Sequence, residues 1–326
     1  MNGRRLRFLD RYAARCANSD LVVNRLAVLA ARSAAEDTGN QPRGSAGISR
    51  RRVPWLIALA ALVSIAGAAA FAQRGGFFYR EGTIPPRYAP EHMPDSSFIF
   101  CRIAYRSVRM EPSGIGWRTD YPYAEINLMT RLSELTKTRV TRDPDHEPLH
   151  YVVRLTDDTL FNCPFVMASD VGTIGLDDDE VEKLRTYLLK GGFFWVDDFW
   201  GTPAWNQWAS QITRVLPPSE YPIEDVELDD PMLRTLFDLH KVPQITNIQF
   251  WRRVGGQTTS ERGDDSPHAD LRVIRDKHGR VMVVMTHNTD VADSWEREGE
   301  DPAFFFQFSP DGYALGIDVL LHAMTH

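Results

Sequence analysis

The sequence predicts an α/β domain with a largely parallel sheet, preceded by one N-terminal hydrophobic helix. Between residues 96 and 326, short apolar stretches typical of buried strands alternate with segments whose apolar residues recur at helical spacing. Such alternation favours parallel strands joined by helices. The clearest single signal is a buried strand that follows Gly191-Gly192 and ends in Asp197-Asp198. Ligands of open α/β sheets bind beyond the carboxyl ends of strands, so this stretch also predicts where a site lies.

Charge is distributed unevenly along the 326 residues, whose net charge is −7. Residues 1–52 contain eleven arginines, no lysine and four acidic residues, a net charge of +7, so the remainder carries −14. We therefore expect an Arg-rich cytoplasmic leader over residues 1–52 and an acidic domain after it. An acidic domain argues against a nucleic-acid ligand, because phosphate binding requires a positive surface.

An uncharged segment of 18 residues, 55–72, directly follows three arginines at 50–52. About 17–25 apolar residues suffice for a membrane-spanning helix, and the preceding arginines predict a cytoplasmic N-terminus and an exported C-terminal domain. Two alternatives stay open for residues 53–72. They form either a retained inner-membrane anchor or the hydrophobic region of a signal peptide cleaved near Ala72, because residues 70–72 have an A-x-A pattern. A buried soluble helix is disfavoured because the segment has no polar face.

Both alternatives place the C-terminal domain in the periplasm. Residues 73–95 are rich in glycine and proline and predict a linker, so the α/β domain is expected over residues 96–326. Of the three cysteines, Cys16 lies in the leader, which leaves Cys101 and Cys163 for at most one disulfide in the exported part. The chain has no C-x-x-C motif or Cys/His cluster, so we expect no structural zinc site and assign no metal ligands.

The first half of the domain contains two strands and two helices. Residues 98–105 predict the first strand, and residues 123–137 predict a helix from the spacing of their apolar residues. A short buried strand is predicted at residues 165–168. Four acidic residues at 177–180 favour the first turn of a helix, which ends at the glycine pair Gly191-Gly192.

The second half begins with the strand of large apolar residues that ends in the two aspartates. A helix over residues 205–216 is stopped by two prolines. Residues 271–274 and 281–285 predict two strands around a turn, and residues 313–324 predict a C-terminal helix.

Asp197 and Asp198 directly follow a buried strand. Successive strand residues point to opposite faces, so the pair is not expected to form a close dyad while the strand continues. One interpretation is a general acid/base or a cation ligand that faces the crevice. The other is a pair of turn carboxylates that bind backbone N–H groups. One of the two can then cap the next helix, which we expect to begin at Pro203 with Thr202 as its N-cap.

A second candidate group lies around the start of the first helix and comprises Trp117, Asp120, Tyr121 and Asn127. Aromatic rings beside an aspartate resemble a polar-ligand or sugar platform, because rings stack on apolar faces while the carboxylate accepts hydrogen bonds from hydroxyls. We favour slightly the alternative in which Asp120 caps the helix and the rings cover the core.

A third group follows the strand that ends at Met285 and comprises His287, Asn288 and Asp290. At a carboxyl edge, His287 can serve as a base and Asn288 as an oxyanion donor, although a lone histidine is more often structural. Neither a G-x-S-x-G elbow nor a P-loop nor a G-x-G-x-x-G motif is present. No serine nucleophile and no nucleotide cofactor are therefore indicated.

Several separated motifs resemble the bacterial domain of unknown function 4159 family over roughly residues 96–326. They are FIFCRIAY at 98–105, WRTDYP at 117–122, LFNCPF at 160–165, LRTYLLKGGF at 184–193, the aspartate pair at 197–198, PQ at 243–244 and YALGID at 313–318. The resemblance implies a class I glutamine amidotransferase-like fold, a three-layer α/β/α sandwich shared with ThuA-like proteins. Members are often exported or membrane-attached, and some occur beside MoxR-type ATPases and von Willebrand A-domain proteins.

The resemblance also argues against amidotransferase activity. In amidotransferases of that fold, the corresponding strand ends in a G-x-C-x-G elbow that carries the nucleophile. Here an aspartate takes the approximate place of the cysteine, between Val196 and Phe199 rather than between small residues. A carboxylate cannot replace a thiolate in glutamine hydrolysis, because the acyl product would be a labile anhydride.

Two functional hypotheses follow. The first is an exported or membrane-anchored envelope protein whose α/β domain binds a ligand or a partner protein, with an envelope protein or a saccharide as the candidates. The alternative is a hydrolase of a carbohydrate or envelope polymer, with Asp197 or Asp198 as acid/base. Such an enzyme needs a carboxylate within hydrogen-bond reach of a second polar group in a concave pocket.

Overall fold

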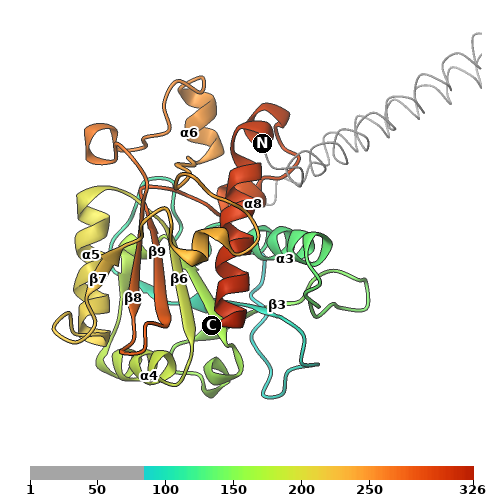
Figure 1. The fold of residues 1–326 in the computed structure, drawn as a ribbon, viewed down its shortest axis with the longest axis vertical. Helices are drawn as coiled ribbons and strands as arrows, with labels where there is room; N and C mark the ends of the chain where they lie inside the picture. The colour runs from blue at the N-terminus through green and yellow to red at the C-terminus, as the bar shows by residue number, and fades with distance from the viewer. Residues whose placement is uncertain (1–83) are drawn as a thin grey trace, which may run out of the picture. The chain divides into compact units, whose positions relative to one another are not determined.

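The computed structural model describes residues 84–326 (Figure 1). The predicted leader, the hydrophobic segment at 53–72 and residues 73–83 of the linker lie outside the described residues. Within residues 84–326, no helix combines the length and the apolar character needed to cross a bilayer. The described residues form an α/β domain around a mixed seven-stranded sheet with the order β3-β1-β4-β6-β9-β8-β7.

Five neighbouring strands of this sheet are parallel, which confirms the predicted α/β class with a mostly parallel sheet. They are β3 (His150–Arg154), β1 (Phe100–Ala104), β4 (Phe165–Ser169), β6 (Phe193–Phe199) and β9 (Val281–His287). Antiparallel pairing then adds β8 (Asp270–Arg275) and β7 (Ile223–Asp225). The central strands are buried on both faces, which explains their nearly continuous apolar sequences. β3 escaped prediction because its apolar run is only three residues long.

Helices cover both faces of the sheet (Figure 1). On one face lie α4 (Asp178–Leu189) and α5 (Gly201–Val215), and on the other lie α3 (Tyr123–Leu135), α7 (Asp293–Glu296) and α8 (Pro302–Thr325). Strand alternation in β6 accounts for this packing. Phe194 lies against Trp208 of α5, with ring centroids 5.9 Å apart, while Trp195 lies against Trp295 of α7 at 6.0 Å.

Shorter elements complete the domain. They are β2 (Arg106–Ser107), paired with β5 (Ile174–Gly175), the helix α6 (Ile248–Arg253), and four 3-10 turns, η1 (Asp158–Asn162), η2 (Val171–Thr173), η3 (Pro231–Arg234) and η4 (Gly263–Asp265). α8 begins at Pro302 rather than at the predicted Tyr313. Asp301 caps it by accepting from the N–H groups of Ala303 and Phe304.

The connections reverse direction between β1 and β4. From β1 the chain passes through α3 on one face to β3, whereas from β4 it passes through α4 on the opposite face to β6. The loops after β1 and β4 therefore diverge above the carboxyl ends of these two adjacent strands. A switch point of this kind opens a crevice that α/β proteins use for ligands.

The segment that leads into β6 follows local sequence rules. Asp177 and Glu180 form a capping box at the start of α4, as the acidic run predicts. Gly191, with φ of 108°, ends the helix, and Gly192 lies so close to Tyr187 that a Cβ atom would come within 2.4 Å of its ring. Glycine is therefore required at this turn, which sets the start of β6.

The predicted start of α5 is wrong. The helix begins at Gly201, not at Pro203, and its N-cap residue Trp200 provides no side-chain cap. Two distant residues satisfy the first N–H groups instead. Asn288 Oδ1 accepts from Gly201 N at 2.8 Å, and Asp265 Oδ2 accepts from Thr202 N at 2.8 Å.

Residues 84–95, in the predicted linker, contact the sheet before Ser96 is reached. Ala89 N donates to Val152 O at 3.0 Å, and Val152 N donates to Arg87 O at 2.8 Å. These bonds pair the segment with the edge strand β3.

Cys101 of β1 and Cys163, two residues before β4, form a disulfide with a Cα–Cα distance of 6.1 Å. This is the pair that the cysteine count left available. The bond closes a loop over a sequence separation of 62 residues and joins the two strands that flank the switch point.

Reducing this disulfide is expected to lower the free energy of unfolding by about 2–4 kcal/mol, because the unfolded chain regains the entropy of an open loop. Urea unfolding of the full chain with and without a reductant measures the change. A Cys16→Ser variant controls for the third cysteine and should show the same loss. Identical midpoints in oxidised and reduced protein would contradict the expectation.

Candidate functional site

Six aspartates gather where β1, β4, β6 and β9 end, and we call them the carboxylate cluster. They are Asp120, Asp170, Asp197, Asp198, Asp290 and Asp293. Five are buried and Asp198 is half-buried. Burial of this many like charges is costly unless protons, hydrogen-bond donors or cations compensate it.

Backbone conformation brings these side chains to the sheet edge. Asp120, Asp170, Asp198 and Asn288 have φ values of 66°, 55°, 54° and 58°, in the left-handed region. They make up four of the six non-glycine residues with positive φ in the described part of the chain. Such conformations cost roughly 1–2 kcal/mol each, and asparagine and aspartate tolerate them best. Their concentration at one edge is a feature of functional sites.

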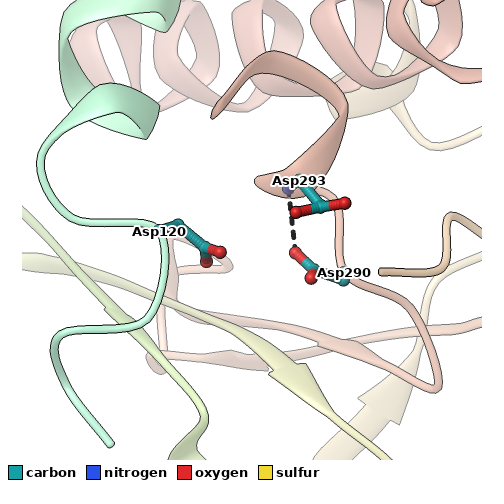
Figure 2. A group of neighbouring side chains, drawn as sticks. All are labelled: Asp120, Asp290 and Asp293. Atoms are coloured by element: carbon teal, nitrogen blue, oxygen red, sulfur yellow. Dashed lines mark hydrogen bonds between the residues drawn. The ribbon is translucent and has the colours of Figure 1, made fainter. Parts of the chain in front are cut away.

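Three members of the cluster can hold a cation. Asp120, Asp290 and Asp293 each bring one carboxylate oxygen within 4.8 Å of the others (Figure 2). Asp120 enters from the loop before α3, Asp290 comes from the connection between β9 and α7, and Asp293 is the first residue of α7. Oxygen ligands of this type suit Mg²⁺ or Ca²⁺. The sequence did not predict this grouping, because only the fold brings the loop after β1 to the loop after β9.

Hydrogen bonds fix the three side chains. Asp293 N donates to Asp290 Oδ1 at 2.9 Å, and Ile248 N donates to Asp293 Oδ2 at 2.7 Å. Ser169 Oγ donates to Asp120 Oδ2 at 2.8 Å. The carboxylates are therefore held in place before any ligand arrives.

Arg102 of β1 supports Asp120 from below. Its side chain is fully buried, forms an ion pair with Glu125, and donates from Nη1 to Ser169 Oγ and Thr119 O, each at 3.0 Å. Arg102 thus positions Asp120 through Ser169 and supplies positive charge beneath the cluster.

Burial raises the pKa of every carboxyl in the cluster. It raises the pKa of Asp120 to about 7 against the opposing Arg102 charge, that of Asp170 to about 7, and that of Asp197 to about 6. Burial and then neighbouring carboxylates place the pKa of Asp198, Asp290 and Asp293 well above the usual range. Protons therefore remain on part of the cluster near neutral pH.

The aspartate pair of β6 divides into two environments. Asp197 accepts from Thr286 Oγ1 at 2.5 Å and from Ala292 N at 2.9 Å, so its two oxygens tie β6 to β9 and to the turn before α7. Asp198 accepts from Trp200 Nε1 at 3.0 Å and lines a pocket. Neither aspartate caps α5.

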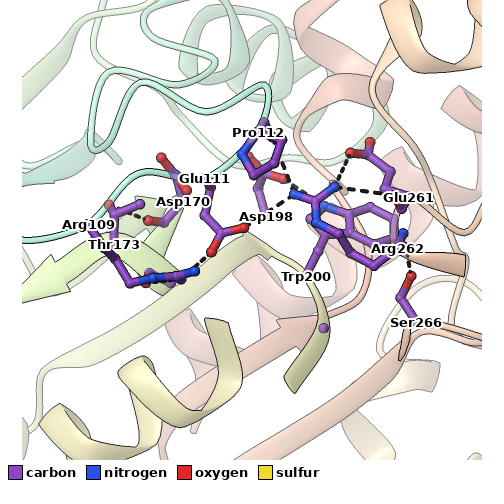
Figure 3. A network of polar contacts seen from close by, with 12 residues as sticks. Arg109, Glu111, Pro112, Asp170, Thr173, Asp198, Trp200, Glu261, Arg262 and Ser266 are labelled. Carbon is purple, nitrogen blue, oxygen red and sulfur yellow. Dashed lines mark hydrogen bonds and ion pairs between the residues drawn. The ribbon is translucent and has the colours of Figure 1, made fainter. Parts of the chain in front are cut away.

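This pocket, which we call the acidic pocket, lies at the switch point and has room for about one water-sized group. Its charged lining residues are Asp290 and, as Figure 3 shows, Glu111, Asp170, Asp198, Glu261 and Arg262. Arg262 is the one basic residue among those that line it in the described part of the chain, and it is paired with Glu111 and Glu261. The lining is therefore acidic even with Arg262 in place.

The model of a family described as a domain of unknown function, DUF4159, matches residues 100–324. The chain belongs to the DUF4159 family. The match includes every residue of the carboxylate cluster and of the acidic pocket. No curated protein matches the chain in sequence. The family description names no activity, so a function for this DUF4159 domain has to be argued from its geometry.

His287 lies apart from the acidic pocket, on the α5 face of the sheet. Its ring is 4.9 Å from that of Phe199 and 5.3 Å from that of Trp205, measured between centroids. Its Nδ1 lies 3.0 Å from Asp270 Oδ2 and its Nε2 lies 3.2 Å from Gly201 O. Both nitrogens thus face protein oxygens rather than a substrate site. The neighbouring Asn288 uses its side-chain oxygen to cap α5.

The aromatic loop of the DUF4159 domain packs into the core. Tyr121 is buried, accepts from Arg87 N at 3.1 Å, and makes an edge contact with the half-buried Trp117 at 5.8 Å. Asn127 donates to Trp295 O at 2.7 Å and so holds α7. The expectation that Asp120 caps α3 is wrong, because α3 starts after Pro122 with no side-chain cap and Asp120 turns into the cluster.

Sequence reasoning missed Glu111, Asp170, Glu261 and Arg262 as pocket residues and did not assign Asp293 to the cluster. Asp170 had a usable signal, because it follows the apolar residues of a strand, as Asp197 and Asp198 do. Glu261 and Arg262 had none, since their segment has no strand or long helix beside it and reaches the pocket only through tertiary contacts.

Between pH 6 and pH 8 the domain is expected to lose stability. The folded pKa of Asp120 and Asp170, about 7, exceeds the ordinary 3.8, so in this window the folded state binds more protons than the unfolded state. The free energy of unfolding therefore falls as pH rises, by roughly 1 kcal/mol for each such group. Urea unfolding at both pH values measures the fall.

Asp120→Asn should reduce this fall by about 1 kcal/mol, because asparagine resembles the protonated carboxyl and does not titrate. Contributions of the histidines are common to both proteins and cancel. Asp178→Asn, at a side chain that is 99% exposed, is the matched control and should leave the fall unchanged. An equal fall in wild type and Asp120→Asn would remove Asp120 as a source.

Proposed function

We propose that this DUF4159 domain binds a positively charged ligand in the acidic pocket. The observation that carries the proposal is the position of the pocket. It lies at the switch point between β1 and β4, where open α/β sheets bind ligands, and its lining is acidic. Charge and position therefore favour the same type of ligand.

Unused hydrogen-bonding capacity supports the proposal. Within the described residues, the carboxylates of Asp170, Asp198 and Asp290 each accept one hydrogen bond. The donors are Gly116 N, Trp200 Nε1 and Asp293 N, in that order. A carboxylate has two oxygens and about four acceptor sites. Acceptor capacity therefore remains for groups that a ligand would bring.

The raised pKa values of the cluster support a cationic ligand. Clustered buried carboxylates relieve their repulsion either by keeping protons or by binding a cation. A cation that enters displaces those protons, so binding is expected to strengthen as pH rises. A metal ion at Asp120, Asp290 and Asp293 and an ammonium group in the pocket share this chemistry.

Hydrolysis of a carbohydrate or envelope polymer is the second candidate function, and it now depends on Asp198. Both carboxylate oxygens of Asp197 already accept hydrogen bonds, from Thr286 Oγ1 and Ala292 N. Asp198 lines the pocket with a strongly raised pKa, a property of general acids.

We also propose that the domain is exported and works in the envelope, anchored in the inner membrane or free after cleavage near Ala72. The disulfide between Cys101 and Cys163 supports an oxidising compartment such as the periplasm. An envelope protein or a saccharide remains a candidate partner. The proposed relation to class I glutamine amidotransferase-like folds is supported by the helices on both faces of a mainly parallel sheet.

Thermal unfolding of the full chain with Mg²⁺, Ca²⁺, Mn²⁺ or putrescine tests the proposed ligand class. A cation present at 100 times its dissociation constant should stabilise the fold by about 2.7 kcal/mol. Asp290→Asn should weaken binding at least about ten-fold, because it removes a charge shared by the pocket and the three-carboxylate group. The exposed variant Asp178→Asn is the control. A chelator distinguishes metal ions from putrescine.

Two results would count against the proposal. One is the absence of stabilisation by all four cations at pH 8, where the cluster is most ionised. The other is stabilisation of equal size in wild type and Asp290→Asn, which would place binding elsewhere.

A further inference from the structure

We propose that the loop of residues 109–115 is a lid over the acidic pocket and that Arg262 is the latch that holds it closed. This inference concerns access to the pocket, and for the nature of the ligand it rests on the proposed function. It assigns Arg262 a role in opening and closing rather than in ligand contact.

The loop has one face on the pocket and one in solvent. Glu111, Pro112, Ser113 and Gly114 line the pocket, whereas the Met110 side chain is 89% exposed. The contact with the pocket floor is close, because a Cβ atom on Gly114 would lie 2.3 Å from the Asp170 carboxylate. In the closed position the loop therefore lies directly on a member of the carboxylate cluster.

Both ends of the loop are fixed to the sheet side of the pocket. Val108 N donates to Thr173 O at 2.8 Å, and Arg109 Nη1 donates to Gly172 O at 2.8 Å. At the other end Gly116 N donates to Asp170 Oδ2 at 2.7 Å. These contacts are suited to act as hinges, because they hold the flanks. Arg109 also pairs with Glu111, so the loop has an internal ion pair besides its contacts to other segments.

The middle of the loop is held by Arg262. Arg262 Nη2 lies 3.2 Å from Glu111 Oε2 and donates to Pro112 O at 3.3 Å (Figure 3). Within the described residues, the polar contacts that join residues 110–114 to segments outside the loop are these two. Ser113 at the tip has φ of 74°, a costly conformation that the closed loop must maintain.

The segment that carries Arg262 is anchored independently of the lid. Glu261 Oε1 accepts from Thr246 Oγ1 at 2.8 Å and from Asn247 N at 2.7 Å. Asp265 caps α5 at Thr202. Loss of the latch is therefore expected to free the lid while this segment stays in place.

Hydrogen exchange of the full-length protein, without added ligand, tests the latch. Arg262→Gln should speed exchange of the Ile115 and Gly116 amides, which donate to Thr119 Oγ1 and Asp170 Oδ2, about ten-fold, the change expected for losing a charge-assisted hydrogen bond, while β9 is unaffected. Arg252→Gln is the matched control. It removes the same charge from a half-exposed arginine paired with Glu300 and Asp301, and should leave the lid unchanged.

Glu111→Gln provides a second variant that acts from the lid side and leaves Arg262 in place. It should speed exchange at the same amides, and the double variant should add little to either single change. Unchanged lid exchange in both folded single variants would overturn the proposal. Additive effects in the double variant would also overturn it, because the two residues would then act separately.

A ligand measurement separates this inference from the proposed function. If Mn²⁺ binds, its association and dissociation rates should both rise in Arg262→Gln, while the dissociation constant changes less than either rate. Failure of every cation to bind would overturn the proposed ligand class, yet the exchange result would still decide the latch. Faster exchange with unchanged rates would overturn the role of the lid in access.

Discussion

Repulsion among carboxylates at the carboxyl edge of the sheet is the constraint that the surrounding structure has to meet. The domain meets it with several devices at once: retained protons, backbone and hydroxyl donors to Asp197, and the buried cation of Arg102 beneath Asp120. Asp198 and Asp290 face the pocket with one hydrogen-bond donor each, so burial and neighbouring carboxylates keep their pKa well above the usual range. The domain thus keeps an electrostatic cost that better-paired residues would avoid, and natural proteins tolerate such costs mainly where they bind or react.

The parallel topology explains why the electrostatic repulsion is concentrated at one edge of the sheet. Each parallel strand delivers its following loop to the same edge, and the reversal between β1 and β4 separates two of those loops. Aspartates in left-handed conformations then turn the chain sharply, so that their side chains lie over the sheet edge instead of alternating between its two faces. The disulfide between Cys101 and Cys163 joins the two strands on either side of this reversal, so the framework of the pocket is covalently tied.

Local signals in the sequence were sufficient for much of the framework. The capping box at Asp177, the glycine turn at Gly191 and the apolar run of β6 all depend on neighbouring residues, and each was predictable. The start of α5 was not, because its cap comes from Asn288 and Asp265 in distant loops. The group formed by Asp120, Asp290 and Asp293 could not be predicted for the same reason. Period and propensity describe one segment at a time, whereas these contacts depend on how separate loops meet.

The short segment that holds Arg262 also holds Asp265, and these residues serve different parts of the molecule. Asp265 completes the first turn of α5, while Arg262 reaches across the pocket entrance. A segment of equal length from a relative therefore cannot replace it unless that segment also supplies both residues. A replacement of the same length without Asp265 would loosen α5 and the pocket entrance together. Sequence change at either of the two positions is therefore restrained by the requirements of the other.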